Sequence, residues 1–149
     1  MFRYYSPVLD QEVAETLWAT KVDETNGVFR LDNIPFYGFE IATQDEFTAI
    51  FDSNEGMYLF ERLVQYSGNS VVLVVVFNSN IDKTEELREQ FLKSGCSSEK
   101  LHDGYFALEI LEAIDYSNIK SILDELENNG TIEYSEPCLS AKHNNDLMN

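Results

Sequence analysis

The chain has 149 residues, 44% of them hydrophobic, which is enough to build a core in one ordinary domain or in two very small ones. It carries 27 acidic and 10 basic residues, giving a formal charge of −17. Such a charge repels nucleic acid and anionic membranes over a Debye length of about 8 Å, and it attracts basic proteins. Direct binding to nucleic acid or membranes is therefore disfavoured, although acidity can also serve solubility alone.

The sequence indicates a cytoplasmic protein. No apolar run near the first residue is long enough for a signal peptide, and the longest apolar run, residues 71–77, has only the length of a strand. Cys96 and Cys138 lie far apart without CxxC spacing, so we expect both to be reduced thiols.

The first half of the chain alternates apolar and polar residues in short segments rich in β-branched and aromatic side chains. These segments are residues 15–22, 27–34, 46–51 and 57–64. Alternation of this kind predicts half-buried strands. Asn26-Gly27 favours a hairpin turn, and residues 53–56 favour a longer loop. We expect an antiparallel sheet that curls into a small β-barrel.

An unusually aromatic connection follows the second of these strands. Pro35 ends the strand because proline has no N–H for the ladder, and Phe36-Tyr37-Gly38-Phe39 comes next. These rings either plug the core or form an exposed contact patch. Loops that close small barrels often donate aromatic residues to the interior, which favours the core.

The pattern changes at Ser70. Residues 71–77 are continuously apolar, which is typical of a strand covered on both faces. A helix is predicted from Asp82 or Thr84 to Lys93, and Gly95 stands where such helices end. Residues 96–101 and 105–111 predict two strands joined by the turn at residues 102–104.

A second helix is predicted from Asp115 or Ser117 to residues 128–130, and residues 131–134 predict a last strand. The order β-α-β-β-α-β is that of a ferredoxin-like sandwich, in which two helices cover one face of a four-stranded antiparallel sheet. The predicted fold is therefore α+β. It has a β-rich subdomain at residues 1–69, a ferredoxin-like subdomain at residues 70–140 and a flexible tail at residues 141–149.

Residues 15–36 carry a family resemblance. Leu17-Trp18-Ala19, the turn at Gly27 and the run at residues 29–36 (FRLDNIPF) resemble the bacterial family called domain of unknown function 4265. In that family a segment ending in Ser-Gly, here Ser67-Gly68, precedes a Val-rich strand. The resemblance implies no enzymatic activity. It implies a small bacterial protein of the kind found beside polymorphic or contact-dependent toxins as their immunity partners.

No residue pattern indicates catalysis or metal binding. The two histidines are His102, in a turn, and His143, in the expected tail, and neither has a clear nucleophile to serve. Cys96 stands in an acidic sequence that opposes thiolate formation, so a buried structural role is expected. Zinc, calcium and phosphate motifs are absent from the sequence. An enzyme that uses paired carboxylates stays an alternative, but 27 acids produce such pairs by chance, and we expect a protein without enzymatic activity or cofactor.

The leading functional hypothesis is an immunity protein that occludes the active site of a basic bacterial toxin, in particular a nuclease, by mimicking its polyanionic substrate. The alternative is a ligand-binding or self-assembling regulatory module of ferredoxin-like type, with at most a weak homodimer through a sheet edge. The predicted partner contacts are two aromatic anchors and either of two acidic clusters. The anchors are Tyr37 and Phe39, and the clusters are Asp45, Glu46, Asp52 and Glu55, or Asp124, Glu125 and Glu127.

Overall fold

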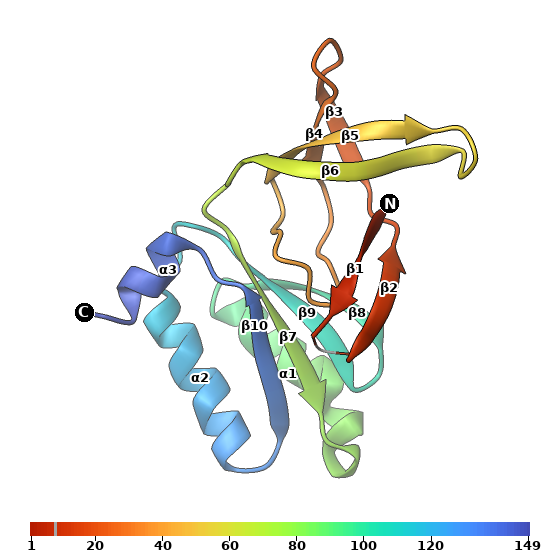
Figure 1. The fold of residues 1–149 in the computed structure, drawn as a ribbon. Coiled ribbons are helices and arrows are strands. Elements are labelled where there is room, and N and C mark those ends of the chain that lie inside the picture. Colours follow the sequence, from red (N-terminus) through yellow and green to blue (C-terminus); the bar gives the residue numbers. More distant parts are fainter. Residues whose placement is uncertain (8) are drawn as a thin grey trace.

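A computed structural model of the chain describes residues 1–7 and 9–149 (Figure 1). In this part of the chain the fold is α+β, and its strands form three antiparallel sheets. The strands are β1 (Phe2–Ser6), β2 (Gln11–Glu15), β3 (Ala19–Asp23), β4 (Val28–Leu31), β5 (Glu46–Asp52), β6 (Met57–Gln65), β7 (Ser70–Val76), β8 (Ser97–His102), β9 (Tyr105–Ile110) and β10 (Ile132–Cys138). The helices are the 3-10 helix η1 (Asn78–Lys83) and the α-helices α1 (Thr84–Lys93), α2 (Tyr116–Asn128) and α3 (Ala141–Asp146).

The N-terminal half consists of a sheet in the order β3-β4-β5-β6 and a separate β1–β2 hairpin. The expected antiparallel sheet is confirmed, but the expected closed barrel is wrong. Met1, just before β1, donates its terminal amine to Tyr58 O at 2.6 Å and accepts from Phe60 N at 3.0 Å. Among the described residues, β1 and β6 are nevertheless not neighbours in one sheet, so the two sheets stay distinct. Their facing side chains share one aromatic core, in which the Phe2 and Phe60 rings stack at a centroid distance of 4.9 Å.

The expected strand over residues 15–22 is divided in the structure. β2 ends at Glu15 and β3 begins at Ala19. Between them the backbone of Trp18 is held from the side: its N–H donates to Asn33 Oδ1 at 2.8 Å, and its carbonyl accepts from Asp32 N at 2.9 Å. These contacts turn the chain from the β1–β2 hairpin into the four-stranded sheet.

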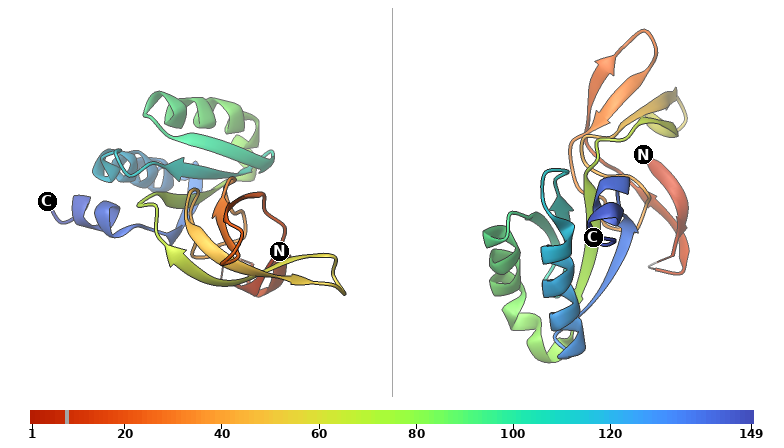
Figure 2. Two further views of the ribbon diagram at one scale, coloured as in Figure 1. Left: turned by 90° about the horizontal axis from the view of Figure 1, so that it is seen from above. Right: turned by 90° about the vertical axis from the view of Figure 1, so that its left-hand side faces the viewer.

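The C-terminal half is a sheet in the order β10-β7-β9-β8 with every neighbouring pair antiparallel. Figure 2 shows α1 and α2 together on one side of this sheet and the N-terminal strands on the other. The alternate residues of β7 that face the helices, Val72, Val74 and Val76, pack against Leu87 and Phe91 of α1 and against α2. The continuous valine run is therefore covered on both faces over most of its length, as its pattern predicts.

Two features of this half refine the prediction: the exact start of α2 and the length of β10. α2 begins after Asp115, whose side chain accepts from Ser117 N at 3.0 Å as an N-cap. β10 is longer than expected and includes Pro137. An edge strand tolerates a proline, because on its outer side no neighbouring strand requires a backbone N–H. The strand is irregular between Ser135 and Cys138.

A third cluster of buried residues joins the two halves. Ile34 and Ala42 from the first half pack on Val71, Leu73 and Ala107 of the second-half sheet, on the face that the helices leave free. The division at residue 69 therefore follows the sheets, while the core continues across it.

The C-terminal segment was expected to be a flexible tail, but residues 141–146 form α3. Ser140 is its N-cap and accepts from His143 N at 3.2 Å. The side chain of His143 has no exposed surface. In Figure 1, α3 lies across the end of the sheet beside the start of α2.

Candidate functional site

The described residues bring one serine and one histidine together, but in a place without access. Ser70 Oγ lies 2.6 Å from His143 Nδ1, and both side chains are fully buried. Ser70 Oγ also accepts from the backbone N–H of Ser140 at 2.8 Å. The pair therefore holds α3 in place, and a substrate would have no path to the hydroxyl.

The described residues give no other reactive group both access and an activating partner. Cys96 is fully buried, and burial, helped by Glu109, raises the pKa of its thiol to about 11. His102 is exposed in its turn, where Nδ1 lies 2.8 Å from the Asp103 carbonyl. Within residues 1–7 and 9–149, no group of three His, Cys, Asp or Glu side chains is arranged to hold a metal ion.

Exposed apolar side chains gather at the projecting end of the β5–β6 hairpin. Ile50 and Phe51 are 60% and 54% exposed, Tyr58 is 40% exposed, and Trp18, which lines a hollow together with Tyr58, is 80% exposed. Figure 1 shows β5 and β6 continuing past the rest of their sheet. We call Trp18, Ile50, Phe51 and Tyr58, with Asp52, Glu55 and Glu61, the hairpin surface.

The strand pairing explains this exposure. β4 pairs with β5 only from Glu46 to Thr48, whereas β5 and β6 stay paired to Asp52 and Met57. Residues 50–52 therefore have a neighbouring strand on one side only. Two adjacent apolar residues in a strand point to opposite faces, so Ile50 and Phe51 present one apolar group on each side of the hairpin.

The tip of the hairpin is a well-formed turn. Asp52 Oδ1 accepts from Asn54 N at 2.8 Å, and Gly56 adopts the positive φ of +68° that favours glycine. A hollow of about 440 Å³ lies beside it, lined by Ile50, Phe51, Asp52, Ser53, Asn54, Leu59, Phe60 and Glu61. The hairpin therefore presents a shallow hollow in which apolar side chains and polar groups, carboxylates among them, alternate.

Both faces of the hairpin end are hollowed. Trp18, Met57 and Tyr58 contribute to a second hollow of about 190 Å³ on the face that looks toward the aromatic core. Lys21 Nζ lies 5.7 Å from the centre of the Tyr58 ring and pairs with Glu24 at 3.2 Å. The ammonium group of Lys21, from the same chain, therefore already lies against the Tyr58 ring of the hairpin surface.

Of the four acidic contacts in the first predicted cluster, two lie on the hairpin surface and two do not. Asp52 and Glu55 are at the hairpin tip, where Glu55 pairs with Arg3. Asp45 is 1% exposed and accepts from Ala42 N at 2.9 Å and from Ser67 N at 2.6 Å, so its carboxylate is no surface contact. Glu46 is half-buried and paired with Arg30 at 2.7 Å.

The predicted aromatic anchors also lie mainly inside. The Phe39 ring packs on Phe2, Tyr4 and Phe60, with centroid distances of 4.7–5.3 Å. Tyr37 is half-buried, and its carbonyl accepts from the Ser6 hydroxyl. The core interpretation of this aromatic stretch therefore fits the structure better than the contact patch.

The second predicted acidic cluster stands on α2, at the opposite end of the molecule from the hairpin (Figure 1). Asp124 accepts from the Tyr134 hydroxyl and lies 3.7 Å from Lys120 Nζ. Glu125 and Glu127 are exposed. The two clusters that the sequence offers as alternative charge contacts therefore lie far apart in the structure.

Sequence reasoning did not assign Trp18, Ile50, Phe51 or Tyr58 to the site. A usable signal was present, because only Asp52 separates Ile50-Phe51 from the loop at residues 53–56. Adjacent apolar residues next to a turn cannot both face one core, so at least one of them must be exposed or covered by another element.

A further hollow of about 460 Å³ lies on the helix-free face of the second sheet. It is lined by Pro7, Leu73, Val75, Tyr105, Glu133, Tyr134, Ser135, Glu136 and Pro137. The Tyr105 hydroxyl donates to the Phe36 carbonyl and is therefore already satisfied. The floor is apolar, and the acidic groups Glu133 and Glu136 come from the edge strand β10.

Comparison with known proteins gives the family and the fold. The sequence pattern of the family described as Domain of unknown function (DUF4265) matches residues 15–134. The chain belongs to this family. The DUF4265 chain is also similar to a solved structure, described as a novel crystal structure of a hypothetical protein from Neisseria gonorrhoeae, with 22% identity and a TM-score of 0.73 over 93% of this chain and 92% of the other.

No functionally curated protein matches the DUF4265 chain. In the described part of the chain, none of the helices combines the length and apolar character that crossing a membrane requires. The match over residues 15–134 confirms the expected family. The similarity to the Neisseria protein supports the overall arrangement of strands and helices.

Proposed function

We propose that this protein is a cytoplasmic immunity protein that binds a basic bacterial toxin, in particular a nuclease, and occludes its active site through the hairpin surface. The observation that carries the proposal is the concentration of exposed apolar side chains among carboxylates at the end of a projecting hairpin. Apolar anchors slow dissociation, while the charge of −17 speeds the approach of a basic partner.

The proposal assigns separate roles to the two kinds of side chain. Phe51, Ile50 and Trp18 lose their water contact when a partner covers them, which contributes about 25 cal/mol per Å² of apolar area. In this proposal, the carboxylates of Asp52, Glu55 and Glu61 occupy the positions that the phosphates of a polyanionic substrate would take in the toxin's active site. The ion pair between Glu55 and Arg3 is exposed and contributes little by itself, so a cation of the partner can replace Arg3 at small cost.

We also propose that residues 70–140 are a ferredoxin-like sandwich. The strand order β10-β7-β9-β8, its antiparallel pairs and the two helices on one face support this assignment. In this arrangement the sandwich serves as the rigid base from which the N-terminal hairpins project.

The test begins with affinity capture of the tagged protein from lysate of its own cells, eluted in rising salt, followed by mass spectrometry of the eluate. A captured basic protein is then expressed in a foreign host with and without the family protein. Growth arrest that co-expression relieves supports the proposal. A captured partner that does not arrest growth contradicts the immunity function.

The binding surface is tested with two variants of equal charge. Asp52→Asn with Glu55→Gln and Glu61→Gln removes three charges at the hairpin, and Asp124→Asn with Glu125→Gln and Glu127→Gln removes three on α2. The hairpin variant should slow association with the captured protein by about tenfold at low salt, and the α2 variant should not. Equal effects of both variants would mean that net charge alone attracts the partner.

A ligand-binding module is the second candidate function, and the hollow on the helix-free sheet face favours it. Its volume of about 460 Å³ lies within the usual range for small-molecule sites, and its floor of Leu73, Val75 and Tyr105 is apolar. Filling it by Val75→Trp distinguishes the two functions. Toxin binding at the hairpin should survive the substitution, whereas a ligand that occupies this hollow should be lost.

A further inference from the structure

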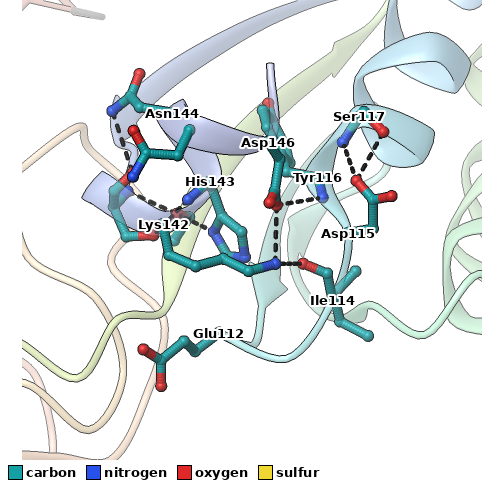
Figure 3. Close-up of polar contacts among 12 residues, drawn as sticks. Glu112, Ile114, Asp115, Tyr116, Ser117, Lys142, His143, Asn144 and Asp146 are labelled. Atoms are coloured by element: carbon teal, nitrogen blue, oxygen red, sulfur yellow. Dashed lines mark hydrogen bonds and ion pairs between the residues drawn. The ribbon is translucent and has the colours of Figure 1, made fainter. Parts of the chain in front are cut away.

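The helix α3 is held to the body of the protein by a compact polar contact beneath it. Figure 3 shows His143 on the inner side of α3, with Lys142 and Asp146 on the same helix turned toward the start of α2. His143 Nδ1 lies 2.6 Å from Ser70 Oγ at the start of β7, and His143 Nε2 lies 3.2 Å from the Leu111 carbonyl after β9. One imidazole therefore touches the ends of two neighbouring strands.

The hydrogen-bond partners fix where the protons lie. The Leu111 carbonyl can only accept, so Nε2 carries the ring proton and donates it. Ser70 Oγ already accepts from Ser140 N at 2.8 Å, and its own hydrogen points to Nδ1. Burial disfavours a charged ring, so the docked imidazole is the neutral tautomer with Nδ1 as an acceptor, and every polar atom of the contact is used.

We propose that α3 is an acid-sensitive latch, docked on β7 and β9 while the imidazole of His143 is neutral and released when that ring takes up a proton. A second proton on Nδ1 would face the Ser70 hydroxyl, which would then have to turn its own hydrogen away from its only acceptor. The same proton would place a full charge on a side chain with no exposed surface.

The charged groups around the ring do not cancel this cost. Burial lowers the pKa of His143 below its ordinary value of 6.5, and the neighbouring ammonium of Lys142 lowers it further. Asp146 opposes the shift, but its carboxylate is already bound by Lys142 Nζ at 2.8 Å and by Tyr116 N at 3.0 Å.

The elements packed against α3 add no free anion at the ring. The Tyr116 ring lies 5.6 Å from the imidazole, and its hydroxyl donates to Glu136, well away from Nδ1. Glu112 is exposed and points away from His143 in Figure 3.

The direction of the pH effect follows from the lowered pKa. Well above pH 6.5 both the docked and the released ring are neutral, and the docked state keeps its full advantage. As the pH falls below 6.5, the released ring takes up a proton first. The population with α3 released then rises by up to about tenfold per pH unit, until the docked ring titrates as well.

Hydrogen–deuterium exchange between pH 7.5 and 5.0, corrected for the intrinsic pH dependence of exchange, tests the latch. A peptide covering residues 139–149 should lose protection by up to about tenfold per unit below pH 6.5. A peptide covering β7 should keep its protection over the same range. Unchanged protection of residues 139–149, or loss in parallel with β7, would overturn the latch.

His143→Asn supplies the matching variant, because its amide can accept from Ser70 but takes up no proton. Its 139–149 peptide should exchange at a rate that, after the same correction, does not depend on pH, whether or not α3 docks as firmly as in the wild type. His102→Asn removes the exposed histidine instead and should keep the wild-type profile. A wild-type pH profile in His143→Asn would assign the effect to another group and sink the proposal.

Discussion

The hydroxyl of Tyr4 donates to Oε2 of Glu15 at 2.8 Å, across the β1–β2 hairpin. The other carboxylate oxygen, Oε1, accepts from Phe36 N at 2.7 Å. Glu15 is only 6% exposed. A single buried carboxylate therefore fastens both strands of the hairpin to the aromatic connection of residues 36–39.

Replacing Glu15 should reveal this role through pH. Burial raises the pKa of Glu15 above its ordinary 4.5, and the hydrogen bonds from Phe36 N and Tyr4 only partly offset the rise. A raised folded pKa stabilises the protein fully below pH 4.5, and this stabilisation is lost as the pH rises through the folded value. The wild type should therefore lose stability relative to Glu15→Gln as the pH is raised from 4.5 to 8 in urea unfolding.

A Glu15→Ala variant is the control for this measurement. It leaves the Phe36 N–H without its acceptor, so its free energy of unfolding should lie about 1–3 kcal/mol below that of Glu15→Gln at every pH. An unfolding free-energy difference between wild type and Glu15→Gln that stays constant with pH would contradict the assignment.

Asp45 should matter for stability and not for binding. Its carboxylate accepts from Ala42 N and from Ser67 N, and its side chain is buried. Asp45→Ala leaves two inner N–H groups unpaired and should cost about 2 kcal/mol or more in urea unfolding. Glu127→Ala on the exposed end of α2 is the matched loss of a carboxylate and should change stability by no more than about 0.5 kcal/mol.

The shared core predicts that the two halves unfold together. Ile34 is 3% exposed and packs on Val71 and Leu73 of the other half. Ile34→Ala should lower the free energy of unfolding by about 2–5 kcal/mol. Exchange protection should fall equally in β4 and β7. A loss confined to β4 would mean that the halves are independent domains.

Both cysteines should be inert in the folded protein. Burial and the nearby Glu109 raise the pKa of Cys96 to about 11, and burial with Asp45 and Glu40 raises that of Cys138 to about 12. A thiol reagent such as DTNB at pH 7.5 should therefore react with neither thiol until denaturant is added. Rapid labelling of native protein would show that one thiol is more accessible than its packing indicates.

The second half of the fold could be predicted because its signals are local. Val72 and its neighbours form an unbroken apolar run, Asp115 caps α2, and Gly95 follows α1 with a φ of +94°. Each of these residues has its effect within a few positions along the chain, so the sequence order and the structural cause coincide.

The β1–β2 hairpin and α3 could not be predicted in the same way. β2 buries little besides Glu15, and α3 buries only His143, so neither shows a periodic apolar stripe. Their order comes from contacts with distant segments, Phe36 for the hairpin and Ser70 for α3. A polar side chain that is buried by remote partners leaves no pattern in its own neighbourhood.

The acidic part of the site was predicted only in part for a related reason. Composition gives the number of carboxylates, but it does not show which of them form hydrogen bonds inside the fold and which reach the surface. Asp45 is enclosed by its own loop, while Asp52 reaches the hairpin tip. The apolar part of the hairpin surface depends on β4 ending before β5 does, a difference in strand length that only the pairing reveals.

The segment between β6 and β7 joins the two halves, and the side chain of Asn69 braces it on both sides. Its amide nitrogen donates to the Thr43 carbonyl at 3.0 Å, and its amide oxygen accepts from Glu112 N at 3.0 Å, while Ser67 Oγ donates to the same Thr43 carbonyl at 2.9 Å. A connection held in this way fixes how the N-terminal sheet is attached to the C-terminal sheet before any partner binds. A partner that contacts both halves would bind a surface that is already arranged. Little conformational entropy of this chain would then be lost when the complex forms.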